Sequence, residues 1–185
     1  MQLKIIFLFT SLVWNQIAFS KDLRKPLPGN EAIYEAIKRY LIEVPTDAII
    51  VYNSERTERA ITIPPLGDNG GVFVILGPGA FTSWALLGST LGHELEVHAR
   101  QNISYAQDRT ERDLPGGLFL IEVEAYLYEI KNKERFGTTE DELNRYVRRW
   151  LKEFVQAEHD VWKRVPSKQF YSLAGNNDYS AILEK

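Results

Sequence analysis

The chain has 185 residues, of which 44% are hydrophobic and 25% charged, which allows one domain with a real core and excludes a disordered composition. Its formal net charge of -3 gives no long-range attraction to nucleic acid or acidic membranes, and we expect no nucleic-acid partner. Cysteine is absent, which excludes disulfides, thiol catalysis and cysteine-based zinc sites.

The first 20 residues have the order of a secretory signal peptide. Lys4 precedes an apolar run over residues 5–14, and the stretch "AFS" ends at Ser20 before a charged segment. This order predicts cleavage after Ser20, because the apolar run is too short to span a bilayer comfortably. An uncleaved membrane anchor is the alternative. We therefore expect residues 21–185 to form the mature protein, secreted or periplasmic and without stable membrane insertion.

The first half of the mature chain has the pattern of one helix followed by a small sheet. Asn30 can cap a helix over residues 31–44, where apolar residues recur at helical spacing, and Pro45 is expected to end that helix. Three runs rich in β-branched and aromatic residues follow, separated by polar or glycine-rich turns. These predicted strands lie within residues 47–53, 60–65 and 72–76.

The second half is predicted to be helical, with helices at residues 84–101, 118–136 and 140–165. Thr82 or Ser83 can cap the first of these helices. Gly137 is expected to end the second. Thr139 and Glu142 form a capping-box pattern in front of the third. A helix and a small sheet followed by a helical half predict a single α+β domain.

Two of the three histidines lie close together in "HELEVH", with Glu94 directly after His93. Two imidazoles on a helix can hold a metal ion, and a carboxylate beside them can take a proton from an activated water. A regular helix would place His93 and His98 about 140° apart, which is poor geometry for a shared ion. A π-type turn of roughly 4.4 residues brings them back to one face. The spacing therefore predicts a π-bulge between the two histidines.

A zinc site needs a third protein ligand, and the next predicted helix offers two. Glu122 and Glu124 interrupt an otherwise apolar run, which packing alone does not explain. We predict Zn²⁺ bound by His93, His98 and Glu122, with Glu124 as the reserve ligand. A competing set combines Glu94, His98 and Glu122.

These motifs resemble those of a known family of zinc peptidases. "HELEVH" with "EVEA" is similar to the H-E-x-x-x-H plus E-x-x-A arrangement of the dipeptidyl peptidase III family, and more broadly to the gluzincin metallopeptidases. The resemblance implies that His93, His98 and Glu122 bind zinc and that Glu94 is the general base. It covers two short motifs, in a chain much smaller than a dipeptidyl peptidase III, and looks more like a compact zincin-like metallopeptidase domain. Where that family often has an acidic residue after the alanine, this sequence has Tyr126.

We therefore expect a secreted zinc metallopeptidase that hydrolyses peptide bonds of a peptide or protein substrate through a metal-activated water. Glu94 would take a proton from the water and pass it to the leaving amine. Tyr105, Tyr126 and His159 are unranked candidates for stabilising the oxyanion. By analogy with zincins, residues 72–76 are expected to pair with an extended substrate.

Two other functions stay open. The chain could be a non-catalytic metal-binding or protein-interaction module, in which case the histidine pair does no chemistry. It could also be an amidase or peptidase that acts on cell-wall peptides, because the sequence does not separate protein from peptidoglycan as a substrate.

Overall fold

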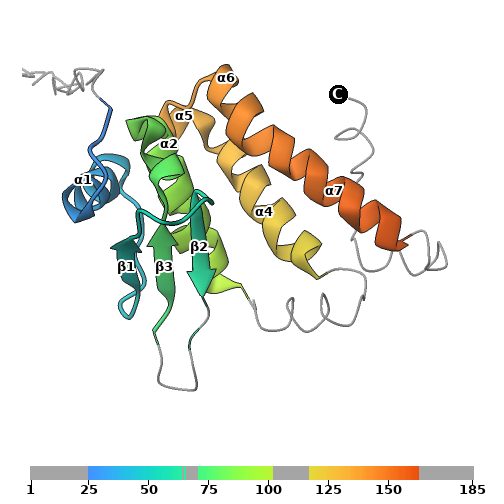
Figure 1. Ribbon diagram of the computed structural model, residues 1–185, viewed down its shortest axis with the longest axis horizontal. Helices are drawn as coiled ribbons and strands as arrows, with labels where there is room; N and C mark the ends of the chain where they lie inside the picture. Colours follow the sequence, from blue (N-terminus) through green and yellow to red (C-terminus); the bar gives the residue numbers. More distant parts are fainter. Residues whose placement is uncertain (1–24, 64, 66–70, 102–116, 163–185) are drawn as a thin grey trace, which may run out of the picture.

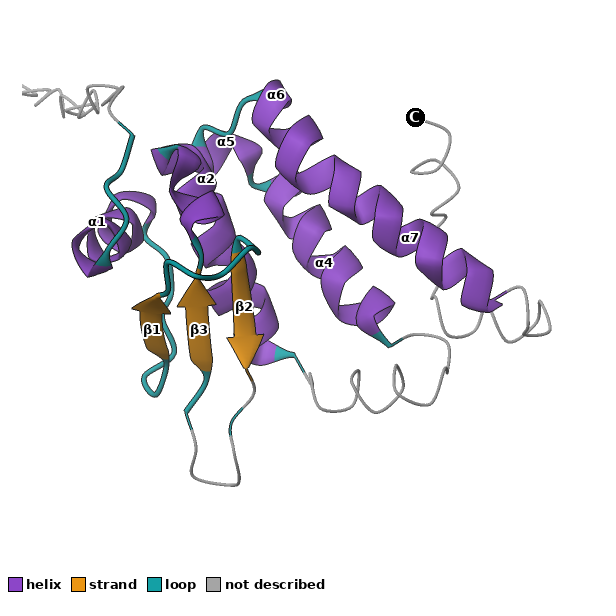
Figure 2. Cartoon of the chain, viewed as in Figure 1, coloured by secondary structure: helices purple, strands orange, loops and turns teal. Residues whose placement is uncertain are grey.

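The computed structural model describes residues 25–63, 65, 71–101 and 117–162, and it confirms the predicted α+β class. The predicted signal peptide and Tyr105 lie outside these residues. The described strands form one three-stranded sheet. Figures 1 and 2 show this sheet and its helices beside a layer of longer helices. The elements in chain order are α1 (Asn30–Tyr40), β1 (Ile49–Tyr52), β2 (Ala60–Ile63), β3 (Phe73–Leu76), the 3₁₀ helix η1 (Pro78–Thr82), α2 (Trp84–Gly92), the π-helix η2 (His93–Val97), the 3₁₀ helix η3 (His98–Arg100), α4 (Leu118–Lys131), α5 (Lys133–Phe136), α6 (Glu140–Leu143), the π-helix η4 (Asn144–Arg148) and α7 (Arg149–Trp162).

Helix α1 begins and ends differently from the prediction. Asn30 is its first residue, and the capping position is Gly29, with no side-chain cap hydrogen bond. The helix ends at Tyr40, well before Pro45, because Leu41 adopts a left-handed conformation with φ 50°. Arg135 makes this early end possible, since its guanidinium donates to the carbonyl oxygens of Tyr40 and Leu41.

The three predicted strands all form, in the order β1-β3-β2. β3 lies in the centre, parallel to β1 and antiparallel to β2. The expectation that residues 72–76 pair with a substrate is therefore wrong, because both edges of β3 are already paired. Among the described strands, β2 has one edge without a partner, and β2 also contacts the π-helix η2.

The core has two parts, which meet at the π-helix η2. The first part joins the sheet to α1 and α2, with Val74 and Leu76 of β3 fully buried in it. The second part lies between α4 and the helices α6, η4 and α7. Because α4 packs against both α7 and η2, it connects the two parts. Within the described residues, no helix has the length and apolar character needed to cross a bilayer.

The predicted caps of the second half are confirmed. The Ser83 side chain accepts a hydrogen bond from the Leu86 amide and so begins α2. Thr139 and Glu142 form the reciprocal capping box in front of α6. Gly137 ends α5 in the left-handed region, with φ 69°. The second predicted helix is broken at Asn132 into α4 and α5, and the third contains the π-segment η4.

Candidate metal centre

Helix α2 leads into the histidine pair and places it in the interior of the protein. All of its residues from Leu86 to Gly92 are buried, so the helix is surrounded by protein rather than lying on the surface. Gly92 stands directly before His93 and allows a close approach of its neighbours. A Cβ atom added there would lie 2.8 Å from the Phe136 ring and 3.1 Å from the Tyr128 hydroxyl. The small residue therefore lets the start of the π-helix reach α4 and α5.

The predicted π-bulge is confirmed, and it spans His93–Val97. The His98 amide donates to the carbonyl oxygen of His93, which is the i to i+5 hydrogen bond that defines a π-turn. The wider turn brings the two imidazoles onto one face. Their ring centroids lie 4.6 Å apart, at an interplanar angle of 75°. The π-turn therefore accommodates the additional residue of the motif and keeps His98 next to His93.

Glu122 of α4 lies opposite both imidazoles. Its Oε2 is 3.8 Å from His93 Nε2, and its Oε1 is 3.6 Å from His98 Nε2. Two ligand atoms bound to one tetrahedral zinc ion lie about 3.4 Å apart, since each is about 2.0–2.2 Å from the metal. One ligand atom from each of the three side chains lies within 4.8 Å of the others. The group could therefore hold a metal ion if the side chains moved closer together.

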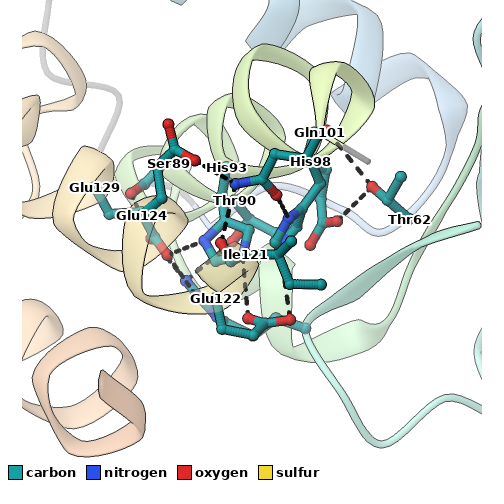
Figure 3. A network of polar contacts seen from close by, with 12 residues as sticks. Thr62, Ser89, Thr90, His93, His98, Gln101, Ile121, Glu122, Glu124 and Glu129 are labelled. Atoms are coloured by element: carbon teal, nitrogen blue, oxygen red, sulfur yellow. Dashed lines mark hydrogen bonds and ion pairs between the residues drawn. The ribbon is translucent and has the colours of Figure 1, made fainter. Parts of the chain in front are cut away.

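The other ring nitrogen of each histidine has a partner that orients it (Figure 3). His93 Nδ1 lies 2.7 Å from Glu129 Oε1, and His98 Nδ1 lies 2.7 Å from Gln101 Oε1. In a neutral imidazole whose proton is on Nδ1, the lone pair of Nε2 faces Glu122. This orientation is the one that a metal site requires, and it is an independent reason to regard the three side chains as ligands.

Glu129 is a fully buried carboxylate that sequence analysis did not single out. Arg59, the residue before β2, binds it with two hydrogen bonds of 3.0 and 2.7 Å, and Ser89 of α2 donates a third. Burial by itself raises the pKa of Glu129, but Arg59 and His93 outweigh it and hold the pKa far below its ordinary value. The negative charge that supports His93 is therefore permanent at neutral pH.

Glu129 provides an acidic partner for His93 on the same helix as Glu122. Glu129 lies seven residues after Glu122, two helical turns along α4, so both side chains face the π-helix. Sequence analysis could have found it as a second acidic residue on the same face of an apolar helix. Arg59 carried no comparable signal, because its pairing with Glu129 depends on how β2 approaches α4.

Glu94, the predicted general base, is buried beside the centre with only 4% of its surface exposed. Thr62 of β2 donates a hydrogen bond of 2.6 Å to its Oε2. The Glu94 charge is also close enough to raise the pKa of His98. Glu94 is therefore held by the edge strand of the sheet at the side of the histidine pair.

Electrostatic attraction links His98 and Glu122 when no metal is bound. Burial lowers the pKa of His98. Its hydrogen bond to Glu122 and the charge of Glu94 outweigh burial and raise the pKa to about 9. Burial raises the pKa of Glu122, and its contacts with the two histidines lower it below the ordinary value. The carboxylates of the cluster thus attract positive charge. A protonated His98 supplies this charge, and a bound cation could supply it instead.

The remaining candidates from the sequence fall in different places. Glu124 is exposed and accepts a hydrogen bond of 2.7 Å from Gln101, so its carboxylate helps to position a partner of His98. His159 belongs to α7, but its side chain lies outside what the structure describes. Tyr126 lies beside the centre, with its ring centroid 4.9 Å from that of His93. Burial raises the pKa of Tyr126 above its ordinary value, so its hydroxyl keeps the proton at neutral pH.

Comparisons with known proteins assign no family to the chain. No protein-family model, curated protein or solved structure matches the chain.

Proposed function

We propose that the protein is a zinc-dependent metallopeptidase that hydrolyses peptide bonds. The observation that carries this proposal is the convergence of His93, His98 and Glu122 with both Nε2 atoms turned towards the carboxylate. Two imidazoles and one carboxylate are a donor set of catalytic zinc sites, which keep a fourth position open for water or substrate. In that position a zinc ion would activate a water molecule and polarise the scissile carbonyl group.

The chemistry of the protein's own residues follows from their placement. Glu94 would accept a proton from the attacking water as the water oxygen bonds to the carbonyl carbon. The same proton would then pass to the nitrogen as the carbon–nitrogen bond breaks, so that one water is consumed and an acid and an amine are released. Thr62 binds only one of the two Glu94 oxygens, which leaves the other for this role.

An extended peptide is the substrate that fits the surroundings best. β2 has an edge that no described strand covers, and Thr62 within β2 contacts Glu94. A peptide added as a fourth strand along this edge would pass next to the general base, with main-chain hydrogen bonds to β2. This replaces β3 with β2 as the strand that would bind the substrate.

The test compares the wild-type chain with its His98→Ala variant. We expect about one zinc per wild-type chain by elemental analysis, and hydrolysis of fluorescein-labelled casein that stops with a chelator. His98→Ala should lose both. Zinc without hydrolysis would instead support a non-catalytic metal-binding module, and a wild-type chain without zinc would contradict the proposal. Parallel assays on crosslinked cell-wall peptides distinguish a protein substrate from peptidoglycan.

We also propose that the protein is exported, to the periplasm or beyond, with loss of residues 1–20. The support is the order of basic, apolar and small residues at the N-terminus. Intact-mass measurement of the exported protein should show a chain that begins at Lys21. Retention of Met1 would favour a membrane anchor instead.

A further inference from the structure

Tyr126 lies on α4, the helix that carries Glu122, and faces the histidine pair. It follows Glu122 by four residues, so the two side chains share one face of α4. Side chains on a helix lean towards its N-terminus, which directs the Tyr126 ring towards the turn of Glu122. The ring packs edge-on against His93, with centroids 4.9 Å apart, and in a tilted arrangement against Phe154 of α7, with centroids 5.9 Å apart. The Tyr126 ring is therefore held between His93 of the π-helix η2 and Phe154 of α7.

The Tyr126 hydroxyl is unusual for a tyrosine with only 8% of its surface exposed. A buried tyrosine hydroxyl usually has a hydrogen-bond partner. None of the described residues provides one for Tyr126. The contrast is Tyr128, whose hydroxyl is engaged by Glu96 and Arg135. Among the described residues, the Tyr126 hydroxyl is thus a donor without a hydrogen-bond partner, on a ring that packs against His93.

We propose that Tyr126 is a catalytic residue that donates a hydrogen bond to the oxyanion of the substrate. This inference rests on the proposed function. As water attacks, the carbonyl double bond becomes a single bond and its oxygen gains negative charge. A hydroxyl already held in place stabilises this charge without reorganisation. The proton stays on Tyr126 throughout, and only Glu94 transfers a proton. Of the three candidates from the sequence, Tyr126 is the one that the described contacts place beside the centre.

The test is Tyr126→Phe, which keeps the ring and its packing and removes only the hydroxyl oxygen. We expect unchanged zinc content and melting temperature, and unchanged KM for the peptide that the wild type cleaves best from casein. We expect kcat to fall by about 10²–10³, the usual effect of removing one oxyanion donor. Tyr146→Phe is the matched control, since it removes a hydroxyl from η4, which contributes none of the proposed ligands.

A binding measurement separates the role of Tyr126 from activity. A phosphonamidate peptide mimics the tetrahedral oxyanion, and calorimetry should show its affinity for zinc-loaded Tyr126→Phe reduced by about the same factor as kcat. The cleaved product peptide, which has no tetrahedral centre, should bind equally to both proteins. Wild-type turnover and analogue affinity in Tyr126→Phe would overturn the inference while the peptidase function stands. A wild-type protein that neither hydrolyses peptides nor binds the analogue would overturn both.

Discussion

Glu94 is the residue whose role is most sharply defined by its contacts. It is buried, it is held by Thr62, and it is not one of the three side chains that could share an ion. A glutamine at this position can still accept the hydrogen bond from Thr62, but it cannot accept a proton from water. The geometry therefore separates the function of Glu94 from its structural contribution.

We expect Glu94→Gln to keep zinc and fold while turnover falls by about 10²–10⁴. Zinc stoichiometry and peptide hydrolysis, measured on the same preparation, provide the check. The competing ligand set of Glu94, His98 and Glu122 predicts a different result, in which Glu94→Gln weakens zinc binding and His93→Ala spares it. Hydrolysis at the wild-type rate in Glu94→Gln would end the metallopeptidase proposal.

Glu129 is expected to matter for both stability and metal binding. Replacing it with glutamine leaves the Arg59 guanidinium, 13% exposed, without its countercharge. Breaking such a buried pair costs about 3–5 kcal/mol. Zinc affinity should also fall about 10–100-fold, because His93 loses the partner that orients it.

Urea unfolding and chelator competition measure these two effects of Glu129→Gln. Glu153→Gln is the control, because Glu153 is half-exposed and, within the part of the chain that the structure describes, pairs with Arg149 on the helix surface. Its stability should stay within about 0.5 kcal/mol of the wild type. Unchanged zinc affinity in Glu129→Gln would show that His93 does not depend on this carboxylate.

At the scale of elements, the π-helix η2 is held in place from outside its own backbone. Glu96, in the middle of η2, accepts hydrogen bonds from Arg135 of α5 and from the Glu43 amide after α1, and it contacts the Tyr128 hydroxyl of α4. Arg135 also binds the last carbonyl oxygens of α1. Three helices are thus tied to the wide turn, which offsets the poorer packing of π-geometry.

We expect Glu96→Gln to lower the free energy of unfolding by about 1–3 kcal/mol at pH 7, because Arg135 loses a charged acceptor. Burial raises the pKa of Glu96, but Arg135 and Tyr128 outweigh it and lower the pKa to about 2. The stabilisation is therefore fully present above pH 4.5 and is lost as pH falls towards 2.

The two proteins should accordingly differ at pH 7 and converge near pH 2–3 in urea unfolding experiments. Glu43→Gln is a suitable control, because the Glu43 side chain is 74% exposed and its ion pair among the described residues is with the half-exposed Arg100. A constant difference between wild type and Glu96→Gln across this pH range would contradict the assigned role of the Glu96 charge.

At the scale of the whole molecule, a metal ion would link the two parts of the core. His93 and His98 follow α2, which belongs to the first part, whereas Glu122 lies on α4 at the second. Zinc that binds only the folded state stabilises it by about 2.7 kcal/mol at 100 times its Kd. For a chain of this length we expect the melting temperature to rise by about 5–10 °C.

The zinc effect should also depend on pH, with a sign set by His98. In the zinc-free protein the raised pKa of His98, about 9, stabilises the fold fully below pH 6.5, and this contribution is lost as pH rises through 9. Zinc must displace the His98 proton, so zinc affinity should increase about tenfold per pH unit up to about pH 9. Glu122→Ala should abolish the thermal response to zinc. A zinc affinity that does not change between pH 6 and 8 would contradict this coupling.

The amino-acid sequence by itself determined the elements and the chemistry of the motif. The strands, the caps of the second half and the π-bulge follow from local patterns, because alternation, capping side chains and the spacing of His93 and His98 act over a few residues. Because these patterns act over only a few residues, they also explain why the predicted end of α1 was wrong. The early end of α1 depends on Arg135, which lies 94 residues after Leu41 in the chain. Local patterns carry no information about such a contact.

Only the tertiary structure decided which groups surround the candidate metal centre. The pairing of Arg59 with Glu129 joins residues 70 positions apart, and the bond from Thr62 to Glu94 spans 32 positions. The central place of β3, which makes β1 and β2 the edge strands of the described sheet, is likewise a matter of sheet order. Local residue patterns predict how a segment folds, but contacts between distant segments form only when their buried faces pack together, and that packing sets the surroundings of the centre.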